Sequence, residues 1–372
     1  MKFTIEKNIL LKNLNNVIKA ISIKNIIPVL NGIKFVLDSK GLELTASNTD
    51  LTIKTFIEKE KIKKIDEEGS IIIQSKYINE IIRKLPDEII DFEVIDGLKV
   101  IIKSKNSKFN LNCLKVEDYP HIPFSYQKDP IVINGNLFKT TIKQTVFAIS
   151  NQESRPILTG LNLKIQGNIM EITSTDSYRL AKKTISLNEV VKEEINITIP
   201  GNNISELDKI IDDDAPIQMH IFSNKILFLY KNIQFQSNLL GGTYPNTNNL
   251  IPDNFTIIFN TNYEDFYSSI DRASLLTQNK EKNIVKMETN KNKLIVSSFA
   301  SEIGRTEEIV DIEKNEGKDI GISFSAKYML DALKAINDNE LIVLLNSEIK
   351  PIVLKSAKDE TLIQIILPVK TY

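Results

Sequence analysis

The nine residues TSTDSYRLA, from Thr173 to Ala181, bring together a carboxylate, several hydroxyl groups, a phenol and a guanidinium. An enzyme could use Asp176 as a general base, with Arg179 as a second catalytic group. However, no histidine lies near Asp176 in the sequence, and the motif holds no second carboxylate. Aspartate and serine are also common in turns. The stretch therefore indicates either a catalytic site or a polar turn that grips a ligand, and the elements around it must distinguish the two.

The rest of the chain offers few residues for catalysis or metal binding. A single cysteine excludes an intrachain disulfide, and only two histidines exclude a histidine-rich zinc site. Cys113 lies in the alternating run KFNLNCL, which favours a buried core residue over the alternative of a reactive thiol. The sequence has no phosphate-binding glycine loop, no G-x-S-x-G and no H-E-x-x-H. We therefore expect no catalytic residue, no metal and no cofactor.

Three segments that begin as a short β-rich run and continue as an amphipathic helix recur along the chain. They cover residues 3–22, 131–150 and 262–276. When the segments are aligned, Leu10, Phe138 and Phe266 fall on corresponding positions, and apolar residues follow at intervals of four. The same order of strand and helix in each segment indicates an internal repeat.

A second repeated motif follows later in each third of the chain. It covers residues 71–85, 197–211 and 320–336. Each copy predicts a strand, a polar region that caps a helix, and the helix itself. The expected caps are Ser75, Asn202 and Ser325.

Two motifs in the same order and at near-constant spacing indicate three copies of one unit. The alternative, a chance likeness between amphipathic segments, does not explain the constant order. Alternating strand patterns outnumber any β-α-β alternation, so we expect an α+β fold of three similar domains, each with antiparallel sheets and two helices. Proline-containing stretches at 119–130 and 241–254 place the domains at 1–125, 126–250 and 251–372.

The formal net charge of −1 conceals an uneven distribution of charge. The first helix of the first unit carries Lys12, Lys19 and Lys24 without an acid, and that of the second carries Lys139 and Lys143 without an acid. Basic helix faces suit contact with phosphates that is independent of base sequence. The alternative is a set of solvated helix faces, and the acidic first helix of the third unit weakens the case for nucleic acid.

The composition is that of an ordinary globular protein, with 42% hydrophobic and 26% charged residues. No apolar run approaches the ~18 residues that would cross a bilayer. Charges interrupt the N-terminal segment before a signal-peptide core could form. We therefore expect a cytoplasmic protein with no membrane contact.

Longer stretches around the opening motif carry a family pattern. SRPILTGLNLKIQGNIMEITSTDSYRLAKKTI contains R-P-x-L-x-G followed by T-D-[GS]-[HY]-R-L-A, and GGTYPNTNNLIP follows G-x-[YF]-P-[DN]-x-x-x-[LV]-[IL]-P. The opening MKFTIEKNILLKNL, the segment RASLLTQNKEKNIVKM and the ending ILPVKTY fit the same family. Over its whole length the chain resembles the bacterial DNA sliding clamp, the β subunit of DNA polymerase III, and this resemblance agrees with the threefold repeat.

The resemblance implies a non-catalytic protomer that forms half of a closed ring, joined head to tail with a second copy. The ring would encircle duplex DNA, slide along it and tether replicative and repair polymerases. The implied partners are a second copy, double-stranded DNA of any sequence, the α subunit of DNA polymerase III, the clamp-loader δ subunit, and other polymerases and repair proteins with clamp-binding peptides. The implied location is the bacterial cytoplasm, at the nucleoid. The alternative is a β-rich peptide-binding scaffold that does not encircle DNA.

Carried over position by position, the resemblance implies a pocket for partner peptides with an apolar centre and a polar rim. Its residues would be Leu158, Thr175, Ser177, Tyr178, Arg179, Leu180, Pro245, Asn249, Leu250, Ser325, Tyr328, Ile349, Pro368, Val369 and Lys370. Asn249 stands where the family often has arginine, and Ser325 where it often has asparagine. In this interpretation Leu180 becomes an anchor for the peptide, and Asp176 becomes a turn residue.

Two further sets of residues concern DNA and the second copy. The resemblance implies DNA contacts for Lys24, Gln152 and Arg155, and charge placement alone adds Lys12, Lys19, Lys139 and Lys143. Apolar pairs matching the family's ring interface are Phe109 with Leu111 and Leu275 with Leu276.

Overall fold

The structure, a computed structural model, describes residues 1–22, 27–86, 88–277 and 283–370. Contacts within the chain divide it into two compact units. The N-terminal unit consists of Met1–Asn136 and Lys209–Leu239, and the C-terminal unit of Leu137–Asp208 and Leu240–Tyr372. In the part of the chain that the structure describes, no helix is long and apolar enough to cross a membrane.

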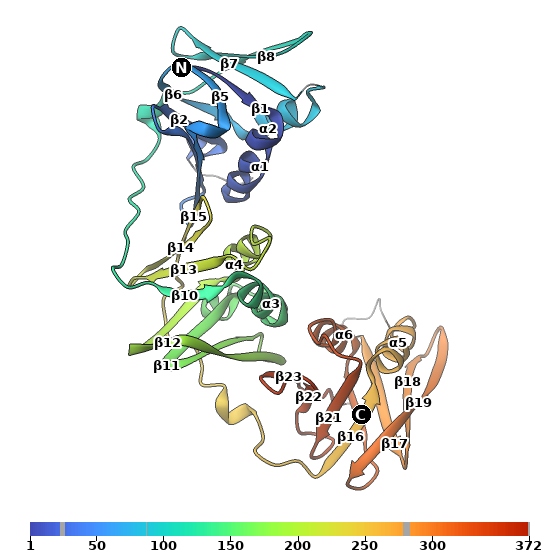
Figure 1. The fold of residues 1–372 in the computed structure, drawn as a ribbon. Coiled ribbons are helices and arrows are strands. Elements are labelled where there is room, and N and C mark those ends of the chain that lie inside the picture. The colour runs from blue at the N-terminus through green and yellow to red at the C-terminus, as the bar shows by residue number, and fades with distance from the viewer. Residues whose placement is uncertain (23–26, 87, 278–282, 371–372) are drawn as a thin grey trace. The chain divides into compact units, whose positions relative to one another are not determined.

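A five-stranded antiparallel sheet and two helices begin the N-terminal unit. The strands are β1 (Lys2–Glu6), β5 (Ile62–Glu67), β7 (Ile89–Ile95), β8 (Lys99–Ser104) and β9 (Ser107–Asn112), and the helices are α1 (Lys7–Val17) and α2 (Ser75–Lys84). The strand order is β5-β1-β7-β8-β9, and α1 packs against α2 (Figure 1). Helix α1 buries Leu10, Leu14 and Val17, which helical periodicity places on one face. Strand β9 is the last strand of this order and therefore lies at an edge of the sheet.

An eight-stranded antiparallel sheet completes the N-terminal unit. Its strands are β2 (Gly32–Asp38), β3 (Gly41–Ser47), β4 (Leu51–Glu58), β6 (Gly69–Gln74), β10 (Ile131–Asn134), β13 (Pro216–Ile221), β14 (Lys225–Tyr230) and β15 (Ile233–Asn238). The order is β10-β13-β14-β15-β4-β3-β2-β6. Strands β15 and β4 pair from Ile233 opposite Thr55 to Ser237 opposite Leu51. Strands from the first and second sequence repeats thus share one sheet.

The connection that leads into β10 is held on this sheet by a buried histidine. The backbone N–H of Gln127 donates to Nδ1 of His220 at 2.8 Å. The side-chain amide of Gln127 pairs with the backbone of Ile221, donating at 2.6 Å and accepting at 3.0 Å. Burial lowers the pKa of His220, and a protonated Nδ1 could not accept the Gln127 hydrogen bond.

We expect the stability of the N-terminal unit to fall as the pH falls below about 6.5, the unfolded-state pKa of histidine. Because the folded-state pKa of His220 lies lower, the unfolded chain binds more protons in this range, and the stabilisation is complete only above it. Thermal melts at pH 7.5 and 5.5 measure the effect. The control His220→Asn keeps an acceptor near the position of Nδ1 and should lose less stability than the wild type. Equal losses in the two proteins would contradict the prediction.

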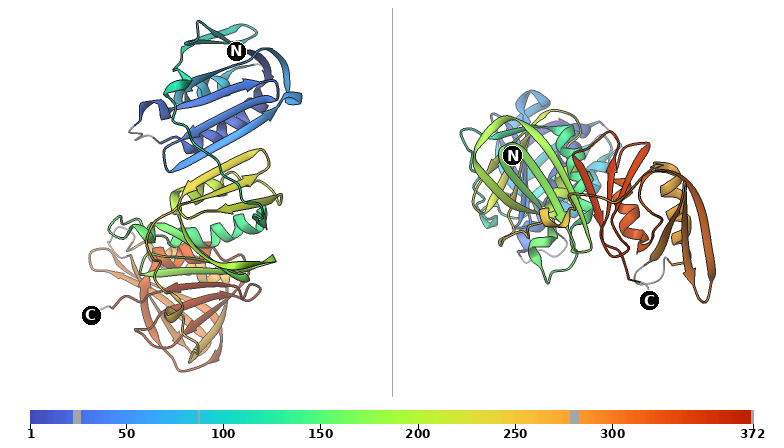
Figure 2. Two further views of the ribbon diagram at one scale, coloured as in Figure 1. Left: turned by 90° about the vertical axis from the view of Figure 1, so that its left-hand side faces the viewer. Right: turned by 90° about the horizontal axis from the view of Figure 1, so that it is seen from below.

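The C-terminal unit is built on a ten-stranded antiparallel sheet. Its strands are β11 (Gly160–Thr175), β12 (Arg179–Pro200), β16 (Ile257–Asn262), β17 (Ile284–Asn290), β18 (Lys293–Ala300), β19 (Gly304–Glu316), β20 (Gly321–Ser325), β21 (Glu340–Leu345), β22 (Ile352–Ser356) and β23 (Leu362–Ile366). Its helices are α3 (Gly135–Thr145), which starts at the boundary of the unit, α4 (Gly201–Asp208), α5 (Tyr263–Ser274) and α6 (Ala326–Lys334). The order is β11-β12-β23-β22-β21-β16-β19-β18-β17-β20. The pairing of β12 with β23 joins the middle of the chain to its end (Figure 2).

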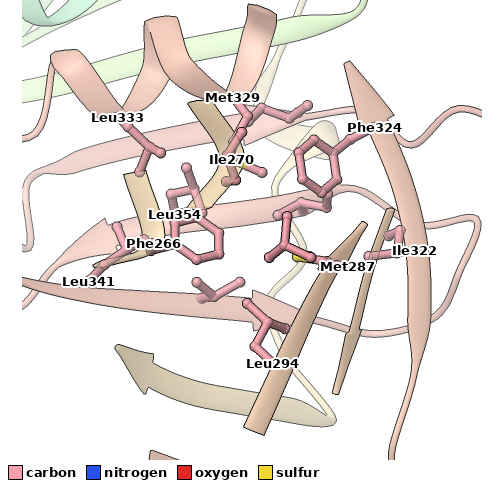
Figure 3. Close-up of a cluster of buried hydrophobic side chains, with 14 of the residues drawn as sticks. Phe266, Ile270, Met287, Leu294, Ile322, Phe324, Met329, Leu333, Leu341 and Leu354 are labelled. Carbon is pink, nitrogen blue, oxygen red and sulfur yellow. The ribbon is translucent and has the colours of Figure 1, made fainter. Parts of the chain in front are cut away.

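An apolar core of this unit lies between α5, α6 and the strands that follow residue 257. Figure 3 shows Phe266 and Ile270 of α5 and Met329 of α6 directed toward side chains of the sheet. Phe266, Ile270 and Met329 are fully buried. The i, i+4 spacing of Phe266 and Ile270 places both on the face of α5 that covers the sheet. This packing fixes α6, and with it Tyr328, relative to the strands.

The internal repeat predicted from the sequence is confirmed. Strands β1, β10 and β16 lead directly into α1, α3 and α5, and strands β6, β12 and β20 lead directly into α2, α4 and α6. The predicted antiparallel α+β class is also confirmed.

Two of the three predicted helix caps are wrong, because Ser75 lies inside α2, where it donates its hydroxyl to the carbonyl of Asn31, and Asn202 lies inside α4. Ser325 occupies the predicted N-cap position of α6, although its side chain makes no capping hydrogen bond. Asn262 caps α5 instead, accepting hydrogen bonds from the backbone of Glu264 and Asp265.

Candidate protein-binding site

The opening motif forms the tight turn between β11 and β12. Oδ1 of Asp176 accepts hydrogen bonds from the backbone N–H groups of Tyr178 and Arg179, at 2.9 and 3.0 Å. Oγ1 of Thr175 donates to the carbonyl of Arg179 at 2.6 Å and accepts from the N–H of Ser177 at 3.1 Å. Ser177 has a φ of 77°, a conformation that turns favour and that most side chains avoid. The interpretation of Asp176 as a turn residue is confirmed.

Arg179 is buried and ion-paired on two sides. Only 8% of its surface is exposed, and its Nε lies 3.0 Å from Oδ2 of Asp176. Its NH1 lies 2.7 Å from Oδ2 of Asp331 in α6. The guanidinium also lies 4.5 Å from the ring centroid of Tyr328 and 5.4 Å from that of Phe147. The charge of Arg179 is therefore satisfied within the protein and does not face solvent as a free cation.

Two tyrosines form an exposed aromatic surface beside this arginine. Tyr178 is 59% exposed, and its ring stacks on that of Tyr328 with centroids 6.4 Å apart and an interplanar angle of 23°. Burial raises the pKa of Tyr328, with a further contribution from the Asp176 carboxylate, so the phenol stays neutral. We call this pair the tyrosine platform. Stacked rings offer an apolar face of the kind that interface residues pack against.

The end of the chain runs beside the tyrosine platform. The N–H of Leu367 donates to the carbonyl of Tyr178 at 2.9 Å, and the N–H of Val369 donates to the carbonyl of Ser323 at 2.7 Å. Pro368 and Val369 are half-buried, and Leu367 and Lys370 are exposed. The sequence motifs did not select Leu367. Its signal was present, since it is the apolar residue that directly follows the buried strand β23.

The two leucines of the predicted pocket lie in the interior. Leu180 is only 2% exposed and packs in a core cluster with Leu344, Val353 and Ile365. Leu158 is also buried. Both side chains are therefore part of the interior in this structure, and the role of Leu180 as a peptide anchor stays a prediction.

The loop that contains Pro245, Asn249 and Leu250 is attached to β12. Nζ of Lys182 donates to Oδ1 of Asn248 at 3.2 Å, in the short 3-10 helix Asn248–Leu250. All three predicted residues of this loop are exposed. Ser325, half-buried, ends β20, and Ile349 is exposed in the loop between β21 and β22. The structure thus brings Tyr178, Arg179, Tyr328 and the chain end together by direct contacts. It leaves Pro245, Asn249, Leu250 and Ile349 exposed in loops.

Most residues predicted to contact DNA are on helices or loops. Lys24 lies outside the described residues. Lys143 is exposed and Lys139 half-buried on α3, while Gln152 and Arg155 are exposed in the loop after it. This loop is connected to the predicted pocket, because the N–H of Leu158 donates to the carbonyl of Arg155 at 3.0 Å.

The two remaining lysines have partners in the N-terminal unit. Nζ of Lys12 lies 3.4 Å from a carboxylate oxygen of Asp212, and Nζ of Lys19 donates to the carbonyl of Asn15 at 2.7 Å. Lys12 is well exposed, so a solvated contact of this kind is weak and leaves it able to meet a phosphate.

Each unit has apolar side chains on its surface at the predicted interface positions. Phe109 is exposed and Leu111 half-buried on the edge strand β9, and Leu275 is 63% exposed after α5, next to the half-buried Leu276. A further apolar residue, Phe299, is 68% exposed on β18. It lies near the end of α5, since the neighbouring Ser298 donates to the carbonyl of Ala273 at 2.6 Å. Sequence reasoning missed Phe299, although an apolar residue at an outward position of an alternating strand is a signal for an interface.

The predicted inert cysteine is confirmed. Cys113 is buried, and burial raises the pKa of its thiol to about 11. Such a thiol stays protonated near neutral pH and is a poor nucleophile. Among the described residues, no group of three or more His, Cys, Asp or Glu side chains could hold a metal ion.

The chain matches three family models along nearly its whole length. Residues 1–123, 132–246 and 248–370 match the N-terminal, central and C-terminal domains of the DNA polymerase III beta subunit. The beta sliding clamp of Bacillus subtilis (strain 168) is 40% identical over 378 residues and that of Staphylococcus aureus (strain N315) 39% identical over 377, each alignment covering all of both chains.

Solved structures agree with these sequence matches. The DNA polymerase sliding clamp from Bacillus subtilis superposes with a TM-score of 0.95 at 40% identity, and the DNA polymerase beta subunit from Streptococcus pyogenes with a TM-score of 0.95 at 30% identity. Both alignments cover the whole of each chain.

Proposed function

Since the chain belongs to the DNA polymerase III beta subunit family, we propose that the tyrosine platform and the chain end beside it receive the peptide tails of polymerases and of the clamp loader. The protein is a DNA sliding clamp, a processivity factor without catalytic activity. It forms a head-to-tail homodimer that encircles duplex DNA, and its partners are DNA, the replicative polymerase and the clamp loader.

One observation carries the proposal for the peptide site: the exposed ring of Tyr178 stacks on the half-buried ring of Tyr328, beside the exposed Leu367. Aromatic side chains that are held in place provide large contact areas at a low cost in conformational entropy. Thr175 and Asp176 hold the turn by hydrogen bonds, and the charge of Arg179 is paired within the protein. The site therefore suits a short apolar peptide better than an acidic substrate.

We further propose the bounds of the domains, the residues that contact DNA and the location in the cell. The domains would be 1–125, 126–250 and 251–372, and the three family matches support boundaries near these positions. Gln152, Arg155, Lys139, Lys143, Lys12, Lys19 and Lys24 would approach the phosphates of the duplex. The protein would act in the bacterial cytoplasm, at the nucleoid.

Charge supports the assignment of β9 and the region after α5 to the ring interface. Residues 99–112, which contain Phe109 and Leu111, carry four lysines and no acid. Residues 302–316, which follow Phe299, carry six acids against two basic residues. In a head-to-tail dimer these segments would meet as a basic and an acidic edge, flanking apolar contacts between Phe109 and Leu111 on one side and Leu275, Leu276 and Phe299 on the other.

Retention on circular DNA tests the sliding function. The protein is loaded onto nicked circular DNA with a clamp loader, and the DNA is then linearised. A ring that holds DNA by topology leaves the linear molecule through its ends and stays on the circle. Retention that does not depend on circularity would contradict encirclement and favour a scaffold that merely binds DNA or peptide.

Replacing Lys12 and Lys19 with glutamine should weaken loading at moderate salt and reduce its salt dependence. Each lost phosphate contact lowers the slope of log affinity against log salt by about 0.9, so the double variant should lose at most about 2. Loading measured between 50 and 200 mM salt gives the slope. The matched control, Lys63→Gln with Lys64→Gln on β5, removes the same charge from the same unit and should behave as the wild type. Identical slopes in all three proteins would remove Lys12 and Lys19 from the DNA surface.

A further inference from the structure

Asp331 supplies the second carboxylate to Arg179 from a distant part of the sequence. The two residues are 152 positions apart, yet NH1 of Arg179 lies 2.7 Å from Oδ2 of Asp331. Asp331 is on α6, three residues after Tyr328, so helical geometry puts both side chains on the same face. The contact therefore connects the turn after β11 to the helix that carries half of the tyrosine platform.

The two carboxylates fix the orientation of the guanidinium plane. Asp176 engages Nε at 3.0 Å and Asp331 engages NH1 at 2.7 Å. Two hydrogen bonds to different nitrogens of a rigid, planar group leave it little freedom to rotate. The plane is further confined between Tyr328, at 4.5 Å, and Phe147, at 5.4 Å.

The ring of Tyr328 contacts both a cation and the ring of Tyr178. One neighbour of the Tyr328 ring is the Arg179 guanidinium, and the ring of Tyr178 stacks on it at 6.4 Å. Phe147 and Tyr328 also pack against the core that α5 and α6 cover, which gives the guanidinium a firm support. If Asp331 lost its charge, Arg179 would keep only Asp176 as an ionic partner, and a cation with 8% exposure would turn toward water or another acceptor.

We propose that Asp331 is a positioning residue of the peptide site. It holds the guanidinium of Arg179 against Tyr328 and Phe147, so that the tyrosine platform is already formed before a peptide arrives. Asp331 does not itself touch the peptide. This proposal rests on the proposed function of the tyrosine platform. Its physical benefit is that the peptide does not have to order the two rings on binding.

The binding of a labelled peptide to the full-length dimer tests the proposal. The probe is a fluorescein-labelled peptide from the C-terminal tail of the DNA polymerase III α subunit, followed by fluorescence anisotropy. Asp331→Asn should weaken binding about tenfold, as expected when an interface anchor loses its preformed position. Asp331→Glu keeps the charge and should restore affinity to within about threefold. The control Glu288→Gln removes a solvent-accessible carboxylate that pairs with Lys286 on β17 and should leave affinity unchanged.

A double-mutant cycle separates positioning from a purely structural role. If Asp331 acts through the rings, adding Asp331→Asn to Tyr178→Ala should weaken binding much less than Asp331→Asn does alone. Independent, multiplicative losses would overturn the proposal, as would an Asp331→Asn variant with a lower melting temperature and wild-type affinity.

A second variant covers the case in which Asp331→Asn does not fold. Phe147→Leu keeps apolar volume but removes the ring face behind the guanidinium, and it should weaken the peptide several-fold. If this variant bound the peptide with wild-type affinity, the fixed position of the Arg179 guanidinium would not be what forms the peptide site. Failure of the wild-type dimer to bind the peptide is a different outcome, because it would overturn the proposed peptide site itself.

Discussion

Replacing Leu275 with aspartate is expected to convert the homodimer into monomers at micromolar concentration. The leucine side chain is 63% exposed in the single chain and would be buried on ring closure. Burying an unpaired carboxylate in an apolar contact costs several kcal/mol. We use about 2–4 kcal/mol for each contact, because the carboxylate can still draw in water. A head-to-tail dimer contains this contact twice, so the dissociation constant should rise by at least about a thousandfold.

Light scattering coupled to gel filtration measures the change in mass. The matched control is Val190→Asp, which puts the same carboxylate at an exposed position of β12 outside the proposed interface and should remain dimeric. The Leu275→Asp monomer should also fail to stay on circular DNA, although its melting transition should resemble that of the control. A dimer of unchanged stability would show that the ring closes through another surface.

Truncation of the tyrosine platform should have the second largest effect. Tyr328→Ala removes the ring that contacts both Arg179 and Tyr178, and Tyr178→Ala removes the exposed partner. Each variant should weaken binding of the polymerase peptide by about 1–3 kcal/mol, with the larger loss for Tyr328 because its removal also takes away the ring contact of Arg179. Anisotropy with the labelled peptide measures both values, and light scattering should show an intact dimer.

Tyr77 provides the control for the variants of the tyrosine platform. Tyr77→Ala removes a tyrosine of α2 that is 50% exposed, and this variant should bind the peptide as the wild type does. Leu180→Ala is less informative, because Leu180 is 2% exposed and its truncation should also destabilise the fold by about 2–5 kcal/mol. If both platform variants bound the peptide with wild-type affinity, the site would have to be sought elsewhere on the protein.

The fold could be predicted because its information is periodic and repeated. The stripe that begins at Leu10, Phe138 and Phe266 recurs three times, and each of the three residues is fully buried in the structure. The turn at Asp176 could also be predicted, because its contacts are local in the sequence. Its carboxylate accepts hydrogen bonds from N–H groups only two and three residues later. Ser75 and Asn202 failed as caps because each lies inside its helix, and a local preference for serine or asparagine does not reveal where the helix begins.

The site was less accessible to sequence reasoning because its contacts join distant residues. Nothing near Arg179 in the chain indicates that a carboxylate of α6 will neutralise it, and nothing in the alternating pattern of RLAKK separates a buried Leu180 from an exposed one. The family resemblance supplied positions but not their environments. Burial of Arg179 and Leu180 and the position of Leu367 beside the turn required the tertiary structure.

The pairing of β4 with β15 has a consequence for how the chain can come apart. Backbone hydrogen bonds from Leu51–Thr55 to Ile233–Ser237 cross the proposed boundary between the first two domains. A fragment ending near residue 125 would leave β4 as a bare strand edge, prone to pair with other chains. Amide hydrogens of these two strands should therefore exchange with deuterium together and late, as one cooperative unit, and the first domain should not be separable as an independently stable protein.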